Sequence, residues 1–277
     1  MVNIVLAYWH HTLDPFLVRF PKDWGIDGIR WYGVAYLLSF FLAYKLLNFF
    51  HTSQRIVFPL QKQQNFLFAL FCGILLGGRL GYAILYAPQY YLQKPLEIFQ
   101  IWQGGMAFHG AIIGIFISLL WFSKANHYNL LSLTDLTIPL GTLGIFFGRI
   151  ANFINGEVYG RYTEVPWGVI FGYDLSPRHP SQLYEAFFEG LILFIFSFSW
   201  IYKGYKQQTP GTLTCLFLVF YGMFRFLVEF VREPDAPLIF FFTRGQFYSI
   251  IMLCLGILGL FYVKVKNRMA DGNIFCR

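Results

Sequence analysis

The sequence predicts an all-α, polytopic membrane protein with about seven transmembrane helices and a small external loop region. Three observations indicate this class: 57% of the residues are hydrophobic, only 13% are charged, and the mean hydropathy is positive at +0.52. Soluble domains carry nearer a quarter charged residues. Because apolar stretches recur along all 277 residues without a long polar block, we predict one domain over residues 1–277.

Seven segments are long enough to cross a bilayer core, which needs about 20 apolar residues per helix. They are roughly residues 31–50, 65–86, 105–123, 133–153, 183–202, 211–230 and 245–263. The first 30 residues contain charges and prolines and do not resemble a cleaved signal peptide. Seven spans place the two termini on opposite sides of the membrane.

The orientation depends on lysine and arginine, which are divided almost evenly between the two sides. The Lys-rich tail KVKNRM is the better indicator, and it places the C-terminus in the cytoplasm and the N-terminus outside. The net charge of +7 is spread over loops, which favours contact with membrane lipids and argues against nucleic acid. The four cysteines form no CxxC or Cys/His pattern, so we predict no metal site, and no cofactor is indicated.

Two connecting segments have their own character. Residues 87–105, APQYYLQKPLEIFQIWQGG, are too polar to cross the bilayer and are rich in aromatic anchors, which predicts an interfacial segment. Residues 157–182 mix glycine, proline and charges, which favours a folded external loop.

Ionisable residues inside membrane spans are rare and are functional candidates by default. In the second span, GGRLGY places Arg79 among glycines, where it either contributes to a site or extends its guanidinium to the surface. In the third span, GGMAFHG places His109 just inside the membrane edge. Such a histidine often bonds only a neighbouring helix, but Gly104, Gly105 and Gly110 leave room for a ligand to approach.

The strongest signal is GRIANFINGEVYGR, at the end of the fourth span. Arg149 and Asn152 share a face if the helix continues to about residue 153, and Asn155 and Gly156 are then suited to end it. A capped helix with a surface ion pair between Glu157 and Arg161 is the structural alternative. Five polar groups in so short a stretch exceed what capping requires.

The sixth span provides a matching polar stripe in YGMFRFLVEFVREPD. Tyr221, Arg225, Glu229 and Arg232 fall within roughly 80° of one helical face. An internal pair between Arg225 and Glu229 explains part of the stripe and leaves the other two residues unexplained. Several arginines with few buried acids to match them predict an anionic ligand, such as a phospholipid, because arginine binds phosphate through a bidentate fork.

These motifs resemble the bacterial prolipoprotein diacylglyceryl transferases, and the similarity covers nearly the whole chain. The motifs RWYGVAYLLSF, GGRLGY, GGMAFHG, GRIANFINGEVYG, RHPSQLYEA and YGMFRFLVEFVREPD follow the order and spacing of that family. The pattern GRxxNFxNxExxG is highly specific to it. Departures are small: Ala111 stands where many members have glycine, and Tyr159 where tryptophan is frequent.

The resemblance implies the reaction and its residues. The diacylglyceryl group of phosphatidylglycerol would move to the lipobox cysteine thiol of a preprolipoprotein in the bacterial cytoplasmic (inner) membrane, leaving glycerol 1-phosphate. Carried over by motif, with Arg79 added from its place in the second span, the site residues fall into two groups. The expected catalytic residues are His109, Arg149, Arg225, Glu157 and Tyr32, and the expected substrate-binding residues are Asn152, Gly160, Tyr221, Arg79, Glu229 and Arg232.

The chemistry of these residue types agrees with that reaction. Arginine can stabilise the charge that develops on a leaving phosphate, and a thiol with a pKa near 8.5 needs a base or a positive field to become a thiolate. His109 is either that base or a ligand of the lipid head group. The rival classes are a transporter for an anionic solute or lipid, which should show charges at several depths and usually internal repeats, and a seven-helix receptor.

Overall fold

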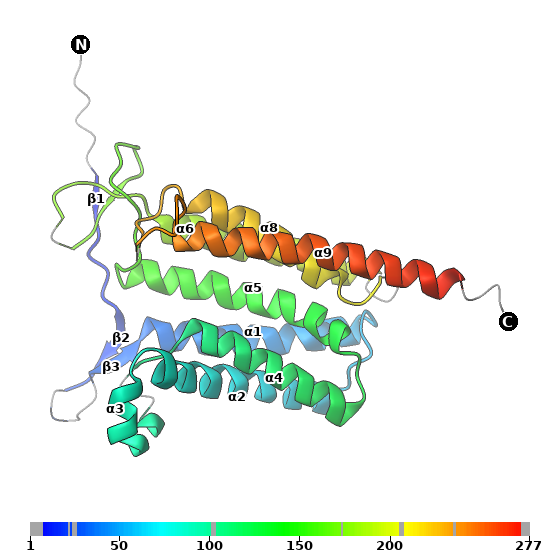
Figure 1. The fold of residues 1–277 in the computed structure, drawn as a ribbon. Coiled ribbons are helices and arrows are strands. Elements are labelled where there is room, and N and C mark those ends of the chain that lie inside the picture. The colour runs from blue at the N-terminus through cyan, green and yellow to red at the C-terminus, as the bar shows by residue number, and fades with distance from the viewer. Residues whose placement is uncertain are drawn as a thin grey trace, which may run out of the picture. The chain divides into compact units, whose positions relative to one another are not determined.

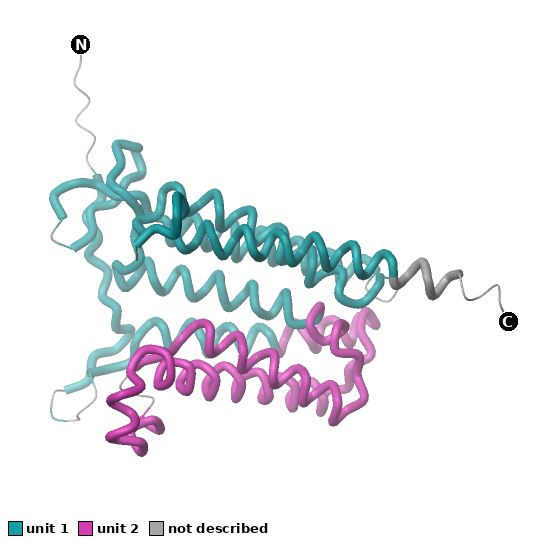
Figure 2. The backbone as a smooth tube through the Cα atoms, viewed as in Figure 1, with its two compact units in different colours: residues 1–43, 136–277 teal, residues 44–135 magenta. Residues whose placement is uncertain are grey.

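The computed structural model describes residues 8–21, 23, 27–100, 104–172, 174–204, 208–234 and 237–272, with side chains up to residue 265. It divides into two compact units, which are described separately: unit 1 comprises residues 1–43 and 136–277, and unit 2 comprises residues 44–135 (Figure 2). Residues 101–103 of the predicted interfacial segment, the side chains of the tail from residue 266 onward, and Cys276 lie outside the described residues.

The structure confirms the all-α class with long apolar helices. The helices are α1 (Trp31–Thr52), α2 (Leu60–Leu85), α4 (Phe108–Asn126), α5 (Leu130–Ile154), α8 (Thr212–Val228), α9 (Arg244–Gly272) and a composite helix over Ser181–Gly204 (Figure 1). Six of the described helices are long and apolar enough to cross a membrane, and α8 is shorter. Each predicted span coincides with one of these seven helices, with ends that differ by a few residues except at α9, which continues nine residues beyond the predicted span.

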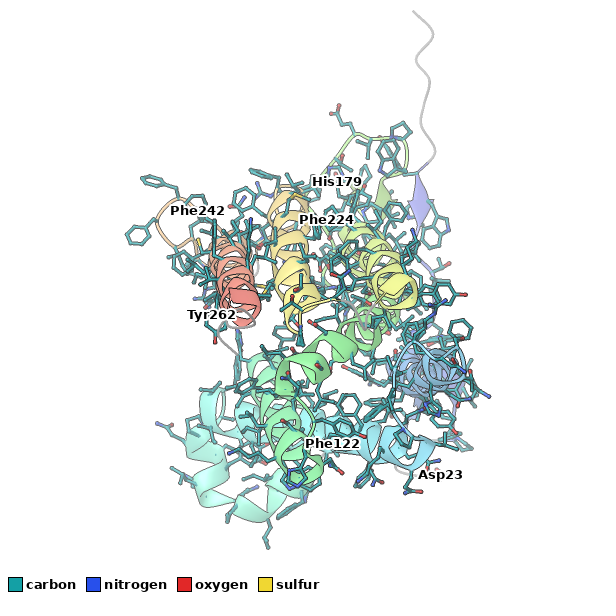
Figure 3. The ribbon with its side chains drawn as sticks, turned by 90° about the vertical axis from the view of Figure 1, so that its right-hand side faces the viewer. Asp23, Phe122, His179, Phe224, Phe242 and Tyr262 are labelled. Carbon is teal, nitrogen blue, oxygen red and sulfur yellow. The ribbon has the colours of Figure 1, made fainter. Side chains whose placement is uncertain are left out.

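The composite helix has three parts, and only the outer two are α-helical. It runs through α6 (Ser181–Glu185), a π-helical segment η4 (Ala186–Ile192) and α7 (Leu193–Gly204). Gly190 of η4 packs directly against the backbone of Phe146 on α5, so the two helices approach closely there. Phe188 of the same segment contacts Phe224 of α8, whose side chain is labelled in Figure 3.

Four short strands occur near the polar helix ends of unit 1. Strand β1 (Trp9–His10) pairs in parallel with β4 (Val169–Ile170), and β2 (Phe16–Arg19) pairs antiparallel with β3 (Gly28–Arg30). These strands, the start of α1, the end of α5 and the start of α9 all lie at the same end of unit 1 (Figure 1). The predicted external loop is therefore a folded segment that is paired with the N-terminal strand.

Unit 2 is centred on α2 and α4, which are in close contact along their lengths. A Cβ atom at Gly110 would overlap the carbonyl oxygen of Gly77, so glycine is required where these two backbones meet. Phe122, labelled in Figure 3, is fully buried in this unit and stacks on Tyr128. The described part of the interfacial segment forms two short exposed helices, α3 (Pro88–Gln93) and η2 (Pro95–Phe99), with apolar side chains facing outward.

Candidate active site

A cluster of arginines and glutamates joins three helices of unit 1. Arg149 of α5 lies 3.0 Å from Glu185 and 3.7 Å from Glu189. Arg225 of α8 forms a close ion pair with Glu185 and lies 3.6 Å from Glu189 and 2.9 Å from Glu229. Glu185 and Glu189 come from the composite helix, so two arginine forks from different helices share the same pair of carboxylates.

The two kinds of residue differ in exposure. The side chains of Glu185 and Glu189 are 0% exposed, whereas those of Arg149 and Arg225 are 22% and 14% exposed. The carboxylates are therefore fully buried, whereas the two arginine side chains are partly exposed. A ligand that approaches this cluster from the surface of the unit contacts the arginine side chains before the carboxylates.

Arg232 completes the cluster, although not as the sequence predicted. The helix α8 ends at Val228, and Arg232 follows a turn instead of continuing the helical stripe. It reaches Glu185 from a backbone bridge to Gly160, with its guanidinium 3.1 Å from the carboxylate. The stripe prediction was wrong about the helix but right about the gathering of Arg225, Glu229 and Arg232.

Glu229 lies where α8 ends and α9 begins. Its carboxylate is packed against Gly245, in the first turn of α9, where the helix dipole favours negative charge. Thr243 and Gln246 cap this helix reciprocally, because the side chain of each accepts the backbone N–H of the other. The pair between Arg225 and Glu229 that the sequence offered as an alternative is present, but Arg225 also contacts two further carboxylates.

This cluster corrects one premise of the sequence analysis. We expected arginines with few buried acids to match them, whereas Arg149, Arg225 and Arg232 face Glu185, Glu189 and Glu229. The cluster is balanced in formal charge. Glu185 and Glu189 were missed, although two acidic residues four apart in an apolar span are a recognisable signal of a buried polar site.

A second polar group lies at the end of α5. The side-chain amide of Asn152 donates to the hydroxyl of Tyr32 and, across 2.9 Å, to Glu157. Asn155 donates to the same oxygen of Glu157 across 3.3 Å. Arg149 precedes Asn152 by three residues on α5 and shares a helical face with it, so this group and the arginine cluster are neighbours.

The helix end itself matches the prediction. The helix α5 ends at Ile154, and Gly156 has a φ of +65°, in the left-handed region that favours glycine. In place of the surface ion pair that was the structural alternative, Glu157 and Arg161 make other contacts. Glu157 accepts the two asparagine amides, and Arg161 donates to the carbonyl of Arg232 across 3.0 Å.

Gly160 has a steric function in the loop that was predicted to be external. Its N–H donates to the carbonyl of His179, and a Cβ atom there would overlap both His179 and the carbonyl of Val231. Any larger residue would separate these segments and displace Arg232. Arg178 reinforces the arrangement, because it donates to the Gly160 carbonyl and lies over the rings of Tyr159 and Tyr162.

Arg79 and His109 belong to unit 2. The five N–H groups of Arg79 donate to the backbone carbonyls of Glu97, Ile98, Gln100, Gly104 and Gly105. The side chain is buried, so it does not extend to the surface. In this conformation the guanidinium anchors the interfacial segment and has no donor left over for a phosphate.

His109 is the second residue of α4 and is exposed. The prediction that Gly110 makes room for a ligand beside it was wrong, since Gly110 is used for contact between α4 and α2. Of the predicted site residues, Tyr32, Arg149, Asn152, Glu157, Gly160, Tyr221, Arg225, Glu229 and Arg232 all lie in unit 1.

Comparison with known proteins identifies close relatives. A family model described as prolipoprotein diacylglyceryl transferase matches residues 23–262. A phosphatidylglycerol–prolipoprotein diacylglyceryl transferase of Polynucleobacter asymbioticus is 44% identical over 255 residues, covering 90% of this chain and 95% of the relative. A protein of the same description from Nitrosomonas europaea is 44% identical, covering 91% of this chain and 91% of the relative. Another from Geobacter sulfurreducens is 42% identical, covering 88% of this chain and 93% of the relative.

Proposed function

Because this chain belongs to the prolipoprotein diacylglyceryl transferase family, we propose that it transfers the diacylglyceryl group of phosphatidylglycerol to the lipobox cysteine of preprolipoproteins. One observation supports this assignment above the others. The guanidinium groups of Arg149 and Arg225 converge from two helices onto one buried pair of carboxylates, and both arginine side chains are partly exposed. Such a pair of forks is suited to a phosphodiester.

The transfer is a substitution at the glycerol carbon next to the phosphate. The thiolate sulfur forms a thioether bond to this carbon, the bond between the carbon and the phosphate oxygen breaks, and glycerol 1-phosphate leaves with the electron pair. Negative charge on the phosphate rises as the bond breaks. Arg149 and Arg225 are placed to stabilise that charge more strongly in the transition state than in the bound lipid.

The remaining residues have supporting roles in this proposal. Tyr32, Asn152 and Glu157 form a hydrogen-bonded group beside the arginines that orients the lipid head group. Tyr221 faces the same carboxylates as Arg149 and Arg225. His109 accepts the thiol proton, since a positioned imidazole is the most effective common base near neutral pH.

The cellular setting follows from the substrate. A multi-pass protein that acts on phosphatidylglycerol and on preprolipoproteins belongs in the bacterial cytoplasmic membrane, with the N-terminus outside and the C-terminus in the cytoplasm. The chain works as one domain in that membrane. A transporter is not favoured, because the three arginines of the cluster are paired with acids at one end of unit 1 and do not mark a path.

The deciding experiment measures glycerol 1-phosphate released by the purified protein from phosphatidylglycerol vesicles containing a lipobox peptide. We expect one glycerol 1-phosphate released per thioether formed, and no release with a peptide in which serine replaces the cysteine. Phosphatidylethanolamine vesicles are the matched lipid control. Release that continues without the cysteine peptide would identify a lipid hydrolase instead.

A further inference from the structure

The two buried glutamates of the composite helix are not equivalent. Glu185 accepts hydrogen bonds from Arg225 and Arg232 and lies 3.0 Å from Arg149. Glu189 lies 3.7 Å from Arg149 and 3.6 Å from Arg225, and both distances are too long for a hydrogen bond. Glu185 is therefore the firm partner of the arginines, and Glu189 is the weak partner.

Glu189 is a buried carboxylate with unmet hydrogen-bonding capacity. It is 0% exposed, and neither of its oxygens makes a well-formed hydrogen bond with a described residue, although the Tyr221 hydroxyl lies nearby. A buried charge without hydrogen bonds is costly unless another interaction compensates it. For Glu189 that compensation is its attraction to the two arginines.

The backbone explains why Glu189 is held at this distance. Glu185 ends α6 and Glu189 lies inside the π-helical segment η4, where the helix is widened. Gly190 fixes this segment against Phe146 of α5. The widened segment thus keeps the second carboxylate within electrostatic range of both forks but outside bonding distance.

We propose that Glu189 is a counter-anion that the lipid phosphate replaces at Arg149 and Arg225, and this proposal rests on the proposed function. Each fork retains an ion pair with another carboxylate while it exchanges Glu189 for phosphate. Arg149 keeps Glu185 through one terminal nitrogen, and Arg225 keeps Glu185 and Glu229. The formal charges of the cluster are balanced without substrate. The lipid phosphate therefore replaces one carboxylate, and the number of anions paired with Arg149 and Arg225 stays the same.

This replacement can be measured, because a carboxylate that competes with the lipid phosphate for the arginines weakens the binding of the lipid. The variant Glu189→Gln keeps the side-chain size and removes the competing charge. We expect the Kd for phosphatidylglycerol and the inhibition constant of glycerol 1-phosphate to fall about tenfold, which corresponds to about 1.4 kcal/mol. Apparent Tm should also rise more on addition of phosphatidylglycerol than it does for the unchanged protein.

Two matched variants make this test specific. Glu229→Gln removes one charge from the same cluster, but among the described ion pairs Glu229 is paired with Arg225 and not with Arg149, so its effect on both constants should be less than about threefold, or below 0.65 kcal/mol. Glu164→Gln, on the exposed part of the external loop, should leave both constants and the turnover unchanged. If Glu229→Gln tightens binding equally, net charge alone accounts for the effect and the proposal is wrong.

The remaining outcomes are also decisive. Weaker binding of phosphatidylglycerol by Glu189→Gln would make Glu189 part of the binding geometry and overturn the proposal. If this variant does not fold, Glu189→Asp keeps the charge on a shorter side chain farther from the forks, and it should tighten binding in the same direction; unchanged or weaker binding would overturn the proposal. Failure of the unchanged protein to bind phosphatidylglycerol would instead contradict the proposed function.

Discussion

Asn152 donates a hydrogen bond from its side-chain nitrogen to Glu157 Oε1 across 2.9 Å, and the same nitrogen bonds the Tyr32 hydroxyl. This relationship fastens the end of α5 to the start of α1 and to the first residue of the external loop. An amide is needed for it, because an aspartate of the same shape has no hydrogen to donate at neutral pH.

The variant Asn152→Asp tests this requirement. It places a second carboxylate beside Glu157, so we expect the turnover to fall at least roughly tenfold, with KM for the lipid increased. Asn129→Asp is the matched control, since Asn129 caps the N–H of Ser132 at the start of α5 and a carboxylate serves there equally well. Normal turnover by Asn152→Asp would limit Asn152 to a packing role.

Arg149→Lys separates charge from geometry. The two terminal nitrogens of Arg149 face different carboxylates, Glu185 and Glu189, and one ammonium group cannot reproduce that fork. We expect loss of most activity, more than about tenfold, with the apparent Tm within a few degrees of the unchanged protein. Arg19→Lys, on an exposed strand, is the control. Near-normal turnover would show that Arg149 acts as a point charge.

Arg79→Lys distinguishes anchoring of the interfacial segment from phosphate binding. Lysine cannot donate to five backbone carbonyls, and a part-buried carbonyl that loses its donor costs up to about 1–3 kcal/mol. We expect the apparent Tm to fall by roughly 5 °C or more, with KM for phosphatidylglycerol nearly unchanged. Lys124→Gln, exposed on α4, should have no such effect. The reverse result, an unchanged apparent Tm with a raised KM for phosphatidylglycerol, would show that Arg79 binds the substrate.

His109→Gln tests the proposed base. Glutamine still hydrogen-bonds a head group but cannot accept the thiol proton, so the rate at neutral pH should fall roughly 10²-fold. Activity should recover in part as the pH approaches the thiol pKa near 8.5, because free thiolate then substitutes for the base. A weakened affinity for the lipid with an unchanged pH profile would assign His109 to head-group binding.

The proposed orientation can be checked with two reporter fusions after the last residue. A reporter that is active only in the cytoplasm should be active, and one that is active only outside should be silent. The opposite pattern would place the arginine cluster on the cytoplasmic side. Preprolipoproteins would then have to be modified before they cross the membrane.

The spans could be predicted from sequence because the bilayer imposes a length and a composition on each helix. The helix end at Ile154 could be predicted because Gly156 supplies a conformation that few other residues adopt. Both features are determined by residues that are close together in the sequence.

The partners of the arginines could not be predicted in the same way. Glu185 meets Arg149 and Arg225 only after three helices pack, and the π-helical segment that sets Glu189 apart has no sequence signature that we recognised. The same limit explains the error at Gly110. A glycine beside a histidine indicates room for a ligand or close helix contact equally well, and only the packing of α2 and α4 decides between them.

The pairing of β1 with β4 has a consequence for the order in which the protein is made. His11 bonds the carbonyl of Phe153, 142 residues later in the chain, and β1 then pairs with Val169–Ile170. During synthesis the N-terminal strand must therefore wait until α5 and the external loop have emerged. Arg149 likewise has no ion pair with Glu185 at first, because α5 leaves the ribosome before Glu185 has been synthesised. The nascent chain carries an uncompensated cation beside the bilayer, at a cost of a few kcal/mol, until the composite helix arrives.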